Sequence, residues 1–492
     1  LAAVAVAARV ADAATRHWAG LGASLAVRRL ARRLPVLATV VLLVAIAAST
    51  TVFAAAFGAT GDRVARDMRE LRVGGDLLVS GWAATADPDL LPVDGVAPVL
   101  SNPGQLGDDT PTILAVPGER LAAALHRLDG LVDPDQLADG VSIPIAGLPL
   151  PAGTTALEFT VVESGGVALE AWVLEPSGRV RLAPLDEPVD GPMAAILAID
   201  ANVSRAGGAI SARITSLVAT TPRGPEPVAL PTDWQPQFAA YPDFEFARFA
   251  MASDALGFEL GRSLPTHNNV RLMAPGEAFA RIPAVLTADF AARNGLSEGD
   301  DVDVRFAGTG RNVVAQVVDT VAGLPMAGDA DAILVDYPAF AEQQLRITEA
   351  IPPTTGLVLR TEDVDAVRAA LPPAATALGL EPGTPDRMLG IARALLWVAA
   401  AGAAVLAALG VASVSSALVA ERRRETRILA VLGETPGRQA RGQRLELAVT
   451  MILALLGGVA SGALMAALAV PSFALAAAPG SGVLPAVELA VD

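Results

Sequence analysis

Three long apolar stretches divide the chain into its main parts. Residues 35–57 hold 23 positions without a charge, and residues 394–420 and 447–470 are equally free of charged residues. An apolar helix of about 20 residues, rising about 1.5 Å per residue, crosses the roughly 30 Å hydrocarbon layer of a membrane. The pattern therefore predicts three complete transmembrane helices, over residues 35–57, 391–420 and 445–470.

Arginines beside these stretches predict the direction in which the helices run. Arg28, Arg29, Arg32 and Arg33 directly precede the first span, and seven arginines lie within residues 421–444, between the second and third spans. Short segments rich in arginine stay on the cytoplasmic side of a membrane. The two clusters agree on one topology. The connection 421–444 is cytoplasmic, whereas residues 58–390 and a tail of residues 471–492 are extracytoplasmic.

Residues 1–34 precede the first complete span. Residues 1–8 are an apolar run without an initial Met, so we expect the end of an earlier transmembrane helix and a chain that is a piece of a longer protein. Trp18, Leu21, Leu25 and Leu30 recur at roughly helical spacing among arginines. This spacing suits a cytoplasmic amphipathic helix at the membrane surface, and a solvated linker is the alternative for its first half.

Residues 58–390 show two different patterns of predicted secondary structure. Residues 112–128 and 332–345 each read as a buried strand, a Pro-containing turn and an amphipathic helix, so they predict equivalent units of a mixed α+β domain. Short strands between Gly, Pro and Ser turns over residues 156–228 predict a β-sandwich or jelly-roll-like insert, with hairpin turns at residues 163–166 and 175–178. The predicted fold class is a membrane α-helical protein with a large extracytoplasmic α/β and β domain.

Composition supports this division. The chain has a mean hydropathy of +0.47 and 52% hydrophobic residues, yet a net charge of −16. Residues 58–390 contain 45 acidic residues and 22 arginines, whereas the flanking parts together contain 7 acidic residues and 14 arginines. The charge therefore predicts an acidic soluble domain between membrane segments with basic margins.

Candidate chemistry is sparse. Every basic residue apart from three histidines is Arg, and a P-loop needs a lysine, so the chain holds no standard Walker-type ATP site. The absence of cysteine excludes disulfides and thiolate metal sites. His17, His126 and His267 are scattered, and no GxSxG or HExxH motif occurs. We therefore predict no catalytic, cofactor or metal site, and any ATP must bind another subunit.

Other polar and aromatic features have plain structural explanations. The acidic run 298–303 lacks EF-hand spacing, and a charged turn before a strand explains it better than a calcium site. Trp82, Trp172, Trp234 and Tyr241 could form a ligand platform, but core packing is the favoured interpretation.

Small residues mark the last span. Gly457, Gly458, Ser461 and Gly462 have the spacing that allows transmembrane helices to approach closely. The apolar runs 35–57, 394–420 and 447–470 contain no ionisable residue, which disfavours a proton-coupled carrier because such pathways usually need one.

The cytoplasmic connection carries a recognisable pattern. Its sequence ERRRETRILAVLGETPGRQ, residues 421–439, resembles the ER-x-RE-x-x-x-L-x-x-x-G-x-T signature of FtsX/MacB-like ABC transporter permeases. The matching positions are Glu421, Arg422, Arg424, Glu425, Leu429, Gly433 and Thr435, with Gln439 a looser match. Thr426 and Glu434 depart from the residue types usual there.

The resemblance implies a helix that extends into the cytoplasm, a tight turn and a short coupling helix that contacts a separate ATP-binding subunit. Glu421 and Glu425 are one helical turn apart. Gly433 suits a helix C-cap, and Thr435 followed by Pro436 suits the start of the next helix. The ATPase-coupling residues expected from this resemblance are Glu421, Arg422, Arg424, Glu425, Gly433, Glu434, Thr435 and Gln439.

The expected function follows from this resemblance. It implies a permease subunit that couples ATP hydrolysis by a partner to movement of its extracytoplasmic domain, for export, lipid or lipoprotein handling, or mechanotransmission. The chain would be the second half of a two-repeat permease in a bacterial plasma membrane, multi-pass and not itself an enzyme. Its expected partners are an ABC-type ATP-binding subunit, the membrane and a second permease repeat or protomer, with no nucleic acid. The alternative is a membrane-anchored surface receptor whose insert binds glycans.

Overall fold

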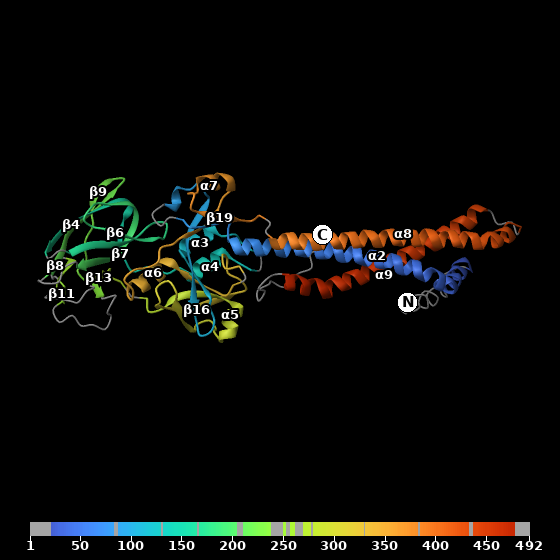
Figure 1. The fold of residues 1–492 in the computed structure, drawn as a ribbon, viewed down its shortest axis with the longest axis horizontal. Coiled ribbons are helices and arrows are strands. Elements are labelled where there is room, and N and C mark those ends of the chain that lie inside the picture. Colours follow the sequence, from blue (N-terminus) through green and yellow to red (C-terminus); the bar gives the residue numbers. More distant parts are fainter. Residues whose placement is uncertain are drawn as a thin grey trace. The chain divides into compact units, whose positions relative to one another are not determined.

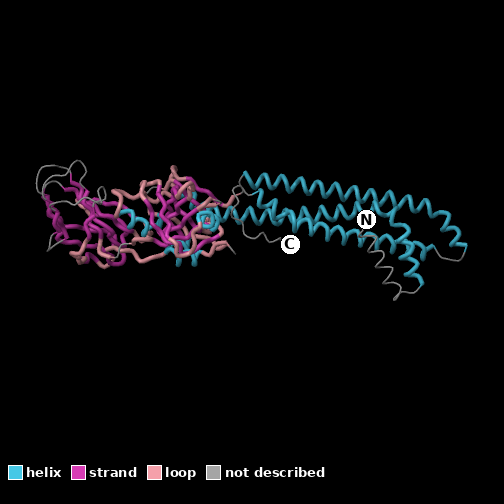
Figure 2. Tube along the Cα trace, turned by 90° about the horizontal axis from the view of Figure 1, so that it is seen from below, coloured by secondary structure: helices cyan, strands magenta, loops and turns pink. Residues whose placement is uncertain are grey.

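The structure is a computed structural model in which the chain forms two compact units (Figure 1). It describes residues 21–82, 87–128, 131–164, 167–203, 210–237, 249–251, 256–260, 269–276, 279–328, 330–381, 384–431 and 436–477. One unit holds residues 21–65 and 384–477, and the other holds residues 66–381. Figure 2 shows that helices make up the first unit and that strands dominate the second.

The helical unit contains three long helices that lie side by side in both views (Figures 1 and 2). They are α2 (Leu21–Val73), α8 (Thr384–Val431) and α9 (Pro436–Ala477). Their stretches Ala38–Val73, Leu389–Ala417 and Leu447–Val470 are long and apolar enough to cross a membrane. The prediction of three transmembrane helices is therefore confirmed, and the protein is a membrane protein.

A nine-stranded sheet forms one half of the second unit. Its strands are β1 (Leu77–Ser80), β2 (Gly95–Gln105), β3 (Thr112–Val116), β14 (Ile282–Thr287), β15 (Asp301–Phe306), β16 (Asn312–Val321), β17 (Ala332–Asp336), β18 (Gly356–Arg360) and β19 (Thr376–Gly379). The order is β15-β16-β14-β17-β3-β2-β18-β1-β19, and β15 also pairs with β2. This extra pairing closes β2, β3, β17, β14, β16 and β15 into a six-stranded barrel. Ile113, Leu286, Val304 and Phe306 belong to its buried core.

Short helices join the strands of this half. They are η1 (Pro88–Leu90), α3 (Gly118–Ala124), α4 (Pro134–Val141), α5 (Ala288–Asn294), α6 (Tyr337–Leu345) and α7 (Val364–Ala370). The two stretches predicted to be equivalent units lie side by side, because β3 and β17 pair in parallel from Thr112 opposite Ala332 to Val116 opposite Asp336. α3 follows the first strand and α6 the second.

The prediction that the second of these helices is amphipathic is wrong. All nine residues of α6 are buried. The physical reason is that α6 contacts apolar residues of two sheets, since one buried cluster holds Phe340 together with Ile333 of the barrel and Leu197 of the other sheet.

That other sheet has ten strands and a core of its own. Its strands are β4 (Leu148–Ser164), β5 (Val167–Leu174), β6 (Val180–Pro184), β7 (Val189–Val203), β8 (Ile210–Thr221), β9 (Gly224–Pro227), β10 (Gln235–Gln237), β11 (Phe249–Met251), β12 (Leu256–Leu260) and β13 (Asn269–Met273). The order is β10-β13-β7-β4-β8-β12-β11, with β5 and β6 added at β7 and with β9 at β8. Leu157, Ile196, Leu217 and Phe258 lie in its core. These strands extend on both sides of the predicted insert 156–228.

One of the two predicted hairpins is present. The turn 175–178 joins β5 and β6, which pair antiparallel. The prediction for the turn 163–166 is wrong, because β4 pairs with β7 and β8, and β5 pairs with β6 and β7. In the described residues β4 and β5 therefore belong to the same sheet but do not pair with each other.

Candidate functional site

The predicted coupling residues lie where two long helices meet in sequence. Glu421, Arg422, Arg424 and Glu425 are in the last part of α8, which ends at Val431. Gln439 is in the first turn of α9, which begins at Pro436, a residue suited to the first helical position. Gly433, Glu434 and Thr435 lie outside the described residues. The charged pattern therefore lies near the C-terminal end of α8, and only four residues separate the end of α8 from the start of α9.

α9 packs on α2 through a stripe of small residues. Thr450, Ala454, Gly458, Gly462, Ala466 and Val470, spaced four apart, are buried. A Cβ added at Gly458 would lie 2.5 Å from the Ala45 carbonyl oxygen, and one added at Gly462 would lie 2.7 Å from the Ser49 carbonyl oxygen. The two helices therefore approach each other at backbone distance, as small residues in membrane helices allow.

The four predicted packing residues divide into two pairs. Gly458 and Gly462 contact α2, whereas Gly457 has open space around it and Ser461 is exposed. Ala454 and Ala466, which are also buried on this face, were not predicted from the sequence. The four-residue spacing through Gly458 and Gly462 was the signal that could have found them, since positions four apart lie on one face of a helix.

α8 packs on α2 as well. A Cβ added at Gly410 would lie 2.7 Å from a methyl carbon of Leu43. Nearer the N-terminal end of α8, Arg393 forms an ion pair with Asp62 and its side chain lies over Gly58, where an added Cβ would be 3.2 Å from the Arg393 Nε. α2 therefore contacts both helices that flank the coupling segment.

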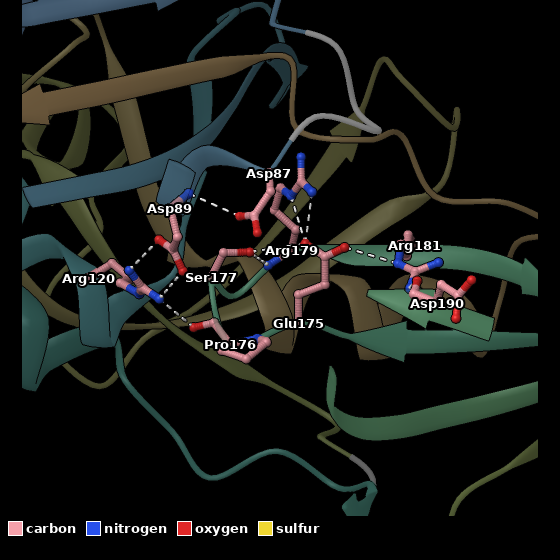
Figure 3. Close-up of polar contacts among 9 residues, drawn as sticks. All are labelled: Asp87, Asp89, Arg120, Glu175, Pro176, Ser177, Arg179, Arg181 and Asp190. Carbon is pink, nitrogen blue, oxygen red and sulfur yellow. Dashed lines mark hydrogen bonds and ion pairs between the residues drawn. The ribbon is translucent and has the colours of Figure 1, made fainter. Parts of the chain in front are cut away.

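The second unit carries a dense cluster of polar contacts at the β5–β6 turn (Figure 3). The Glu175 carboxylate, 5% exposed, accepts hydrogen bonds from Arg179 Nε at 2.9 Å and Nη2 at 2.8 Å, and from Ser177 Oγ at 3.2 Å. Its other oxygen lies 3.0 Å from Arg181 Nε. A buried carboxylate with these partners is well compensated and holds the turn in a single shape.

This turn also contacts α3 and its surroundings. Gly178 has a φ of +85°, and an added Cβ would lie 2.4 Å from the Pro117 side chain, directly before α3. Arg120 donates to the Pro176 carbonyl at 2.8 Å and to the Asp89 carboxylate at 2.9 and 3.1 Å (Figure 3). The ten-stranded sheet is thus bonded to the helix that follows β3.

Asp336 connects the two helices of the equivalent units. Its Oδ1 accepts from the Gly118 amide of α3 at 2.8 Å and its Oδ2 from the Ala339 amide of α6 at 3.2 Å. Burial raises the pKa of this carboxyl to about 7, while the two amides lower the pKa and nearby Glu119 raises it. One carboxylate therefore caps two helices, although α3 has no capping side chain at its own N-cap residue, Pro117.

Other residues singled out in the sequence have structural roles. Trp82, Trp172 and Trp234 are buried in the core, and Tyr241 lies outside the described residues. His126 Nε2 is 3.0 Å from the Asp76 carboxylate. Within the described ranges, no group of three or more His, Cys, Asp or Glu residues could hold a metal ion.

The acidic run 298–303 forms an exposed turn that leads into β15. Within it, Asp300 accepts from the Ser297 amide at 2.8 Å. The run is therefore a capped loop in this structure, as a charged turn before a strand predicts.

The long helices and their uncharged stretches define a multi-helix membrane protein. Residues 397–489 match the family model of the FtsX-like permease C-terminal domain. This C-terminal part of the chain therefore belongs to the FtsX-like permease family, as the pattern at residues 421–439 indicates. No curated protein sequence matches the chain.

The family sets the class of function. FtsX-like permeases are components of ABC transporters and work with their ATP-binding subunits. The match therefore supports, at the level of the family, a permease component of an ABC transporter.

Proposed function

We propose that this chain is the permease subunit of a bacterial ABC transporter that converts ATP hydrolysis on a separate subunit into movement of its extracytoplasmic domain. The observation that carries the proposal is the family match over residues 397–489, which includes the charged end of α8, the turn and α9. The chain itself has no lysine for a Walker motif, so ATP binds the partner.

The first step of the proposed coupling occurs at the cytoplasmic turn. Glu421 and Glu425 are four residues apart in α8, a spacing that places two positions on one face of a helix, and we assign them to the contact with the ATP-binding subunit. A change in that surface on ATP binding displaces the ends of α8 and α9 together, because only residues 432–435 separate the two helices.

The second step passes through the helix packing. α9 meets α2 at Gly458 and Gly462 with backbone contacts, so a displacement of α9 along this seam moves the α2 backbone directly. Close-packed interfaces of this kind have few intermediate arrangements, which favours movement of whole helices over local deformation.

The third step uses the last turns of α2. Residues 66–73 of this helix belong to the second unit, where Leu71 is 1% exposed and its carbonyl accepts from the Met326 amide at 2.9 Å. Arg69 donates to the Leu380 carbonyl at 2.6 Å. The end of the membrane helix is therefore part of the core of the exported domain, and a movement of α2 acts on that core.

The work is done on material outside the membrane, such as an exported molecule, a lipid or lipoprotein, or a cell-wall enzyme that the domain activates. The uncharged spans suit this mode of action, because they offer no polar path for an ion. Trp82, Trp172 and Trp234 are buried, so no observation here favours the glycan-receptor alternative. We also retain the hypothesis that the chain is one half of a permease with two such units.

ATPase coupling tests the proposal. The full-length protein with its ATP-binding subunit in lipid nanodiscs should show a lower ATPase rate with Glu425→Gln than with the wild-type sequence. Glu446→Gln, the same change on α9 outside the family-like pattern, is the matched control and should leave the rate unchanged. Equal rates for all three proteins would contradict the assigned role of residues 421–439.

A further inference from the structure

Helix α6 is held between the barrel and the ten-stranded sheet. In the strand-rich unit of Figure 1 it lies between the two sets of strands. Its Phe340 packs edge-on against Phe306 of β15, with ring centroids 5.0 Å apart, and belongs to the same cluster as Trp172 and Met273 of the ten-stranded sheet. All nine residues of α6 are buried, so the helix is covered on all sides. The two sheets therefore share one continuous core through α6.

Arg271 of β13 fixes the end of this helix. The side chain is fully buried, and Nη1 donates to the carbonyls of Leu345 and Thr348 at 2.6 Å each. Nη2 donates to the Glu349 carbonyl at 2.6 Å. Helix C-termini present carbonyl groups without partners and carry a partial negative charge, so a buried guanidinium is well suited to bind them.

The charge of Arg271 is balanced within its own sheet. Nε and Nη2 bind the two oxygens of Asp200 at 2.6 and 2.7 Å, and Trp172 donates to the same carboxylate at 3.0 Å. The Trp172 ring also lies 5.5 Å from the guanidinium carbon. All five N–H groups of the guanidinium thus have acceptors, which no lysine or neutral side chain of this length could reproduce.

A second attachment holds the other helix of the pair. The β5–β6 turn seats Gly178 against Pro117, and Arg120 of α3 binds the Pro176 carbonyl at 2.8 Å. α3 and α6 are in turn joined by Asp336. The ten-stranded sheet therefore contacts two different helices of the barrel half, and a single swinging motion cannot leave both contacts intact.

The chain connections between the two halves are also close to each other. The barrel half leads into the ten-stranded sheet through residues 142–147 and out of it from residue 274. A Cβ added at Gly276, which has a φ of +147°, would lie 2.5 Å from the Cβ of Ala146. Two adjacent connections alone would permit a hinge, so the contacts of Arg271 and of the β5–β6 turn decide whether one exists.

From this arrangement we infer that the ten-stranded sheet and the barrel move as one rigid body, and that Arg271 is the positioning residue that keeps them together. The sheet then extends the barrel as a fixed arm and does not open or close against it. This inference concerns only the exported domain and stands independently of the proposed ATPase coupling.

Distance measurements in the intact protein test the inference. The sequence has no cysteine, so Val162→Cys on β4 and Asp303→Cys on β15, both at exposed positions, give two unique sites for spin labels. Double electron–electron resonance on the full chain in nanodiscs should give one narrow distance distribution. Two separated distances in the otherwise unaltered protein would overturn the inference without any further variant.

Substitutions then identify the residue responsible. Arg271→Met keeps most of the side-chain volume but removes all five donors, and it should broaden and shift the distance distribution. Arg213→Met, on β8 of the same sheet at a surface ion pair with Glu259, is the matched control and should leave the distribution unchanged. A wild-type distribution in the Arg271→Met protein would assign the rigidity to other contacts and refute the role given to Arg271.

A milder variant covers the case in which Arg271→Met does not fold. Arg271→Lys retains the charge beside Asp200 but cannot reach three carbonyls at once. It should increase hydrogen exchange in residues 345–352 and broaden the same distance distribution. Unchanged exchange and an unchanged distance would count against the inference just as directly.

Discussion

Replacing Asp336 with Asn has two opposite effects on stability. It removes one of two helix caps, and it removes the cost of ionising a buried carboxyl group. Asp336 is 4% exposed and uses one oxygen for the Gly118 amide and the other for the Ala339 amide. Asn keeps a single acceptor and turns an NH2 group towards one of the amides. The variant therefore loses one helix cap, but it also removes a carboxylate whose ionised form is disfavoured in the fold.

The magnitudes of the two effects can be compared. Loss of one N-cap costs about 1 kcal/mol, and a buried amide left facing another donor adds about 1–3 kcal/mol. Against this, a pKa raised from 3.8 to about 7 corresponds to about 4 kcal/mol against the ionised form above pH 7. The loss and the gain are similar in size, so the sign of the net change depends on pH.

The direction of the pH dependence follows from proton binding. Between pH 4 and 7 the folded state holds a proton on Asp336 that the unfolded state has released, so this group makes the protein less stable as pH rises. Asn does not titrate. Asp336→Asn should therefore be clearly less stable than the wild-type protein at pH 5, and the difference should shrink or reverse at pH 8.

Thermal unfolding of the full chain in detergent at pH 5 and pH 8 measures this difference, and hydrogen exchange of residues 112–124 and 332–345 localises it. Other titrating groups are common to both proteins and cancel in the comparison. Asp363→Asn is the control for the Asp-to-Asn change itself, because the exposed cap of α7 uses one oxygen and Asn retains that acceptor. A stability difference of the same size at both pH values would refute the reasoning about Asp336.

Three further predictions concern packing and charge. Gly462→Val should prevent α9 from approaching the Ser49 backbone and should lower the thermal stability of the membrane unit. Gly457→Val, at an open position, should leave that stability unchanged. Equal effects of the two substitutions would contradict the packing of α9 on α2. Phe340→Ala should cost about 3–5 kcal/mol in thermal or denaturant unfolding because it opens a cavity between two sheets, and a loss below about 1 kcal/mol would show that the site is not close-packed. Arg393→Gln should cost less than about 1 kcal/mol, and less at high salt, because its ion pair with Asp62 is exposed; a larger loss measured by thermal unfolding would indicate a desolvated pair.

Local sequence patterns predicted the elements well where a single segment determines them. The uncharged run 35–57 lies within α2, and the strand–turn–helix patterns at residues 112–128 and 332–345 correspond to β3–α3 and β17–α6. Pro436 coincides with the start of α9. These features depend on hydropathy, turn residues and capping within a few residues of sequence, which is the information that a sequence pattern carries.

Structural features that depend on contacts between segments distant in sequence could not be predicted from local sequence patterns. Closure of the barrel rests on β15 meeting β2 at Arg305 and Phe306. α6 contains Glu342, Gln343 and Gln344, which favour an amphipathic interpretation, yet all three are buried, and Gln343 and Gln344 donate to the carbonyls of Val314 and Asn312 in β16. The sequence shows that a side chain in a helix is polar, but it does not show which distant element will pack over that side chain.

The burial of Arg271 likewise could not be predicted from the sequence. An arginine in a short strand is typically a surface residue, and only the spatial arrangement of Asp200, Trp172 and the end of α6 accounts for its burial. The predicted coupling residues differ from Arg271, because the sequence indicated them before the structure was known. They were predicted from a family-like pattern alone, because the contact proposed for them is with another polypeptide.

Co-purification tests the proposed coupling to a separate ATP-binding subunit most directly. The full-length protein, purified in mild detergent from cells that also produce the candidate ATP-binding subunit, should retain that subunit, and Gly433→Val in the α8–α9 turn should reduce the amount retained. Gly457→Val, on α9 at an open position, serves as the control and should retain the wild-type amount. Absence of any ATP-binding subunit from the wild-type preparation, or its undiminished retention by Gly433→Val, would contradict coupling through residues 421–444.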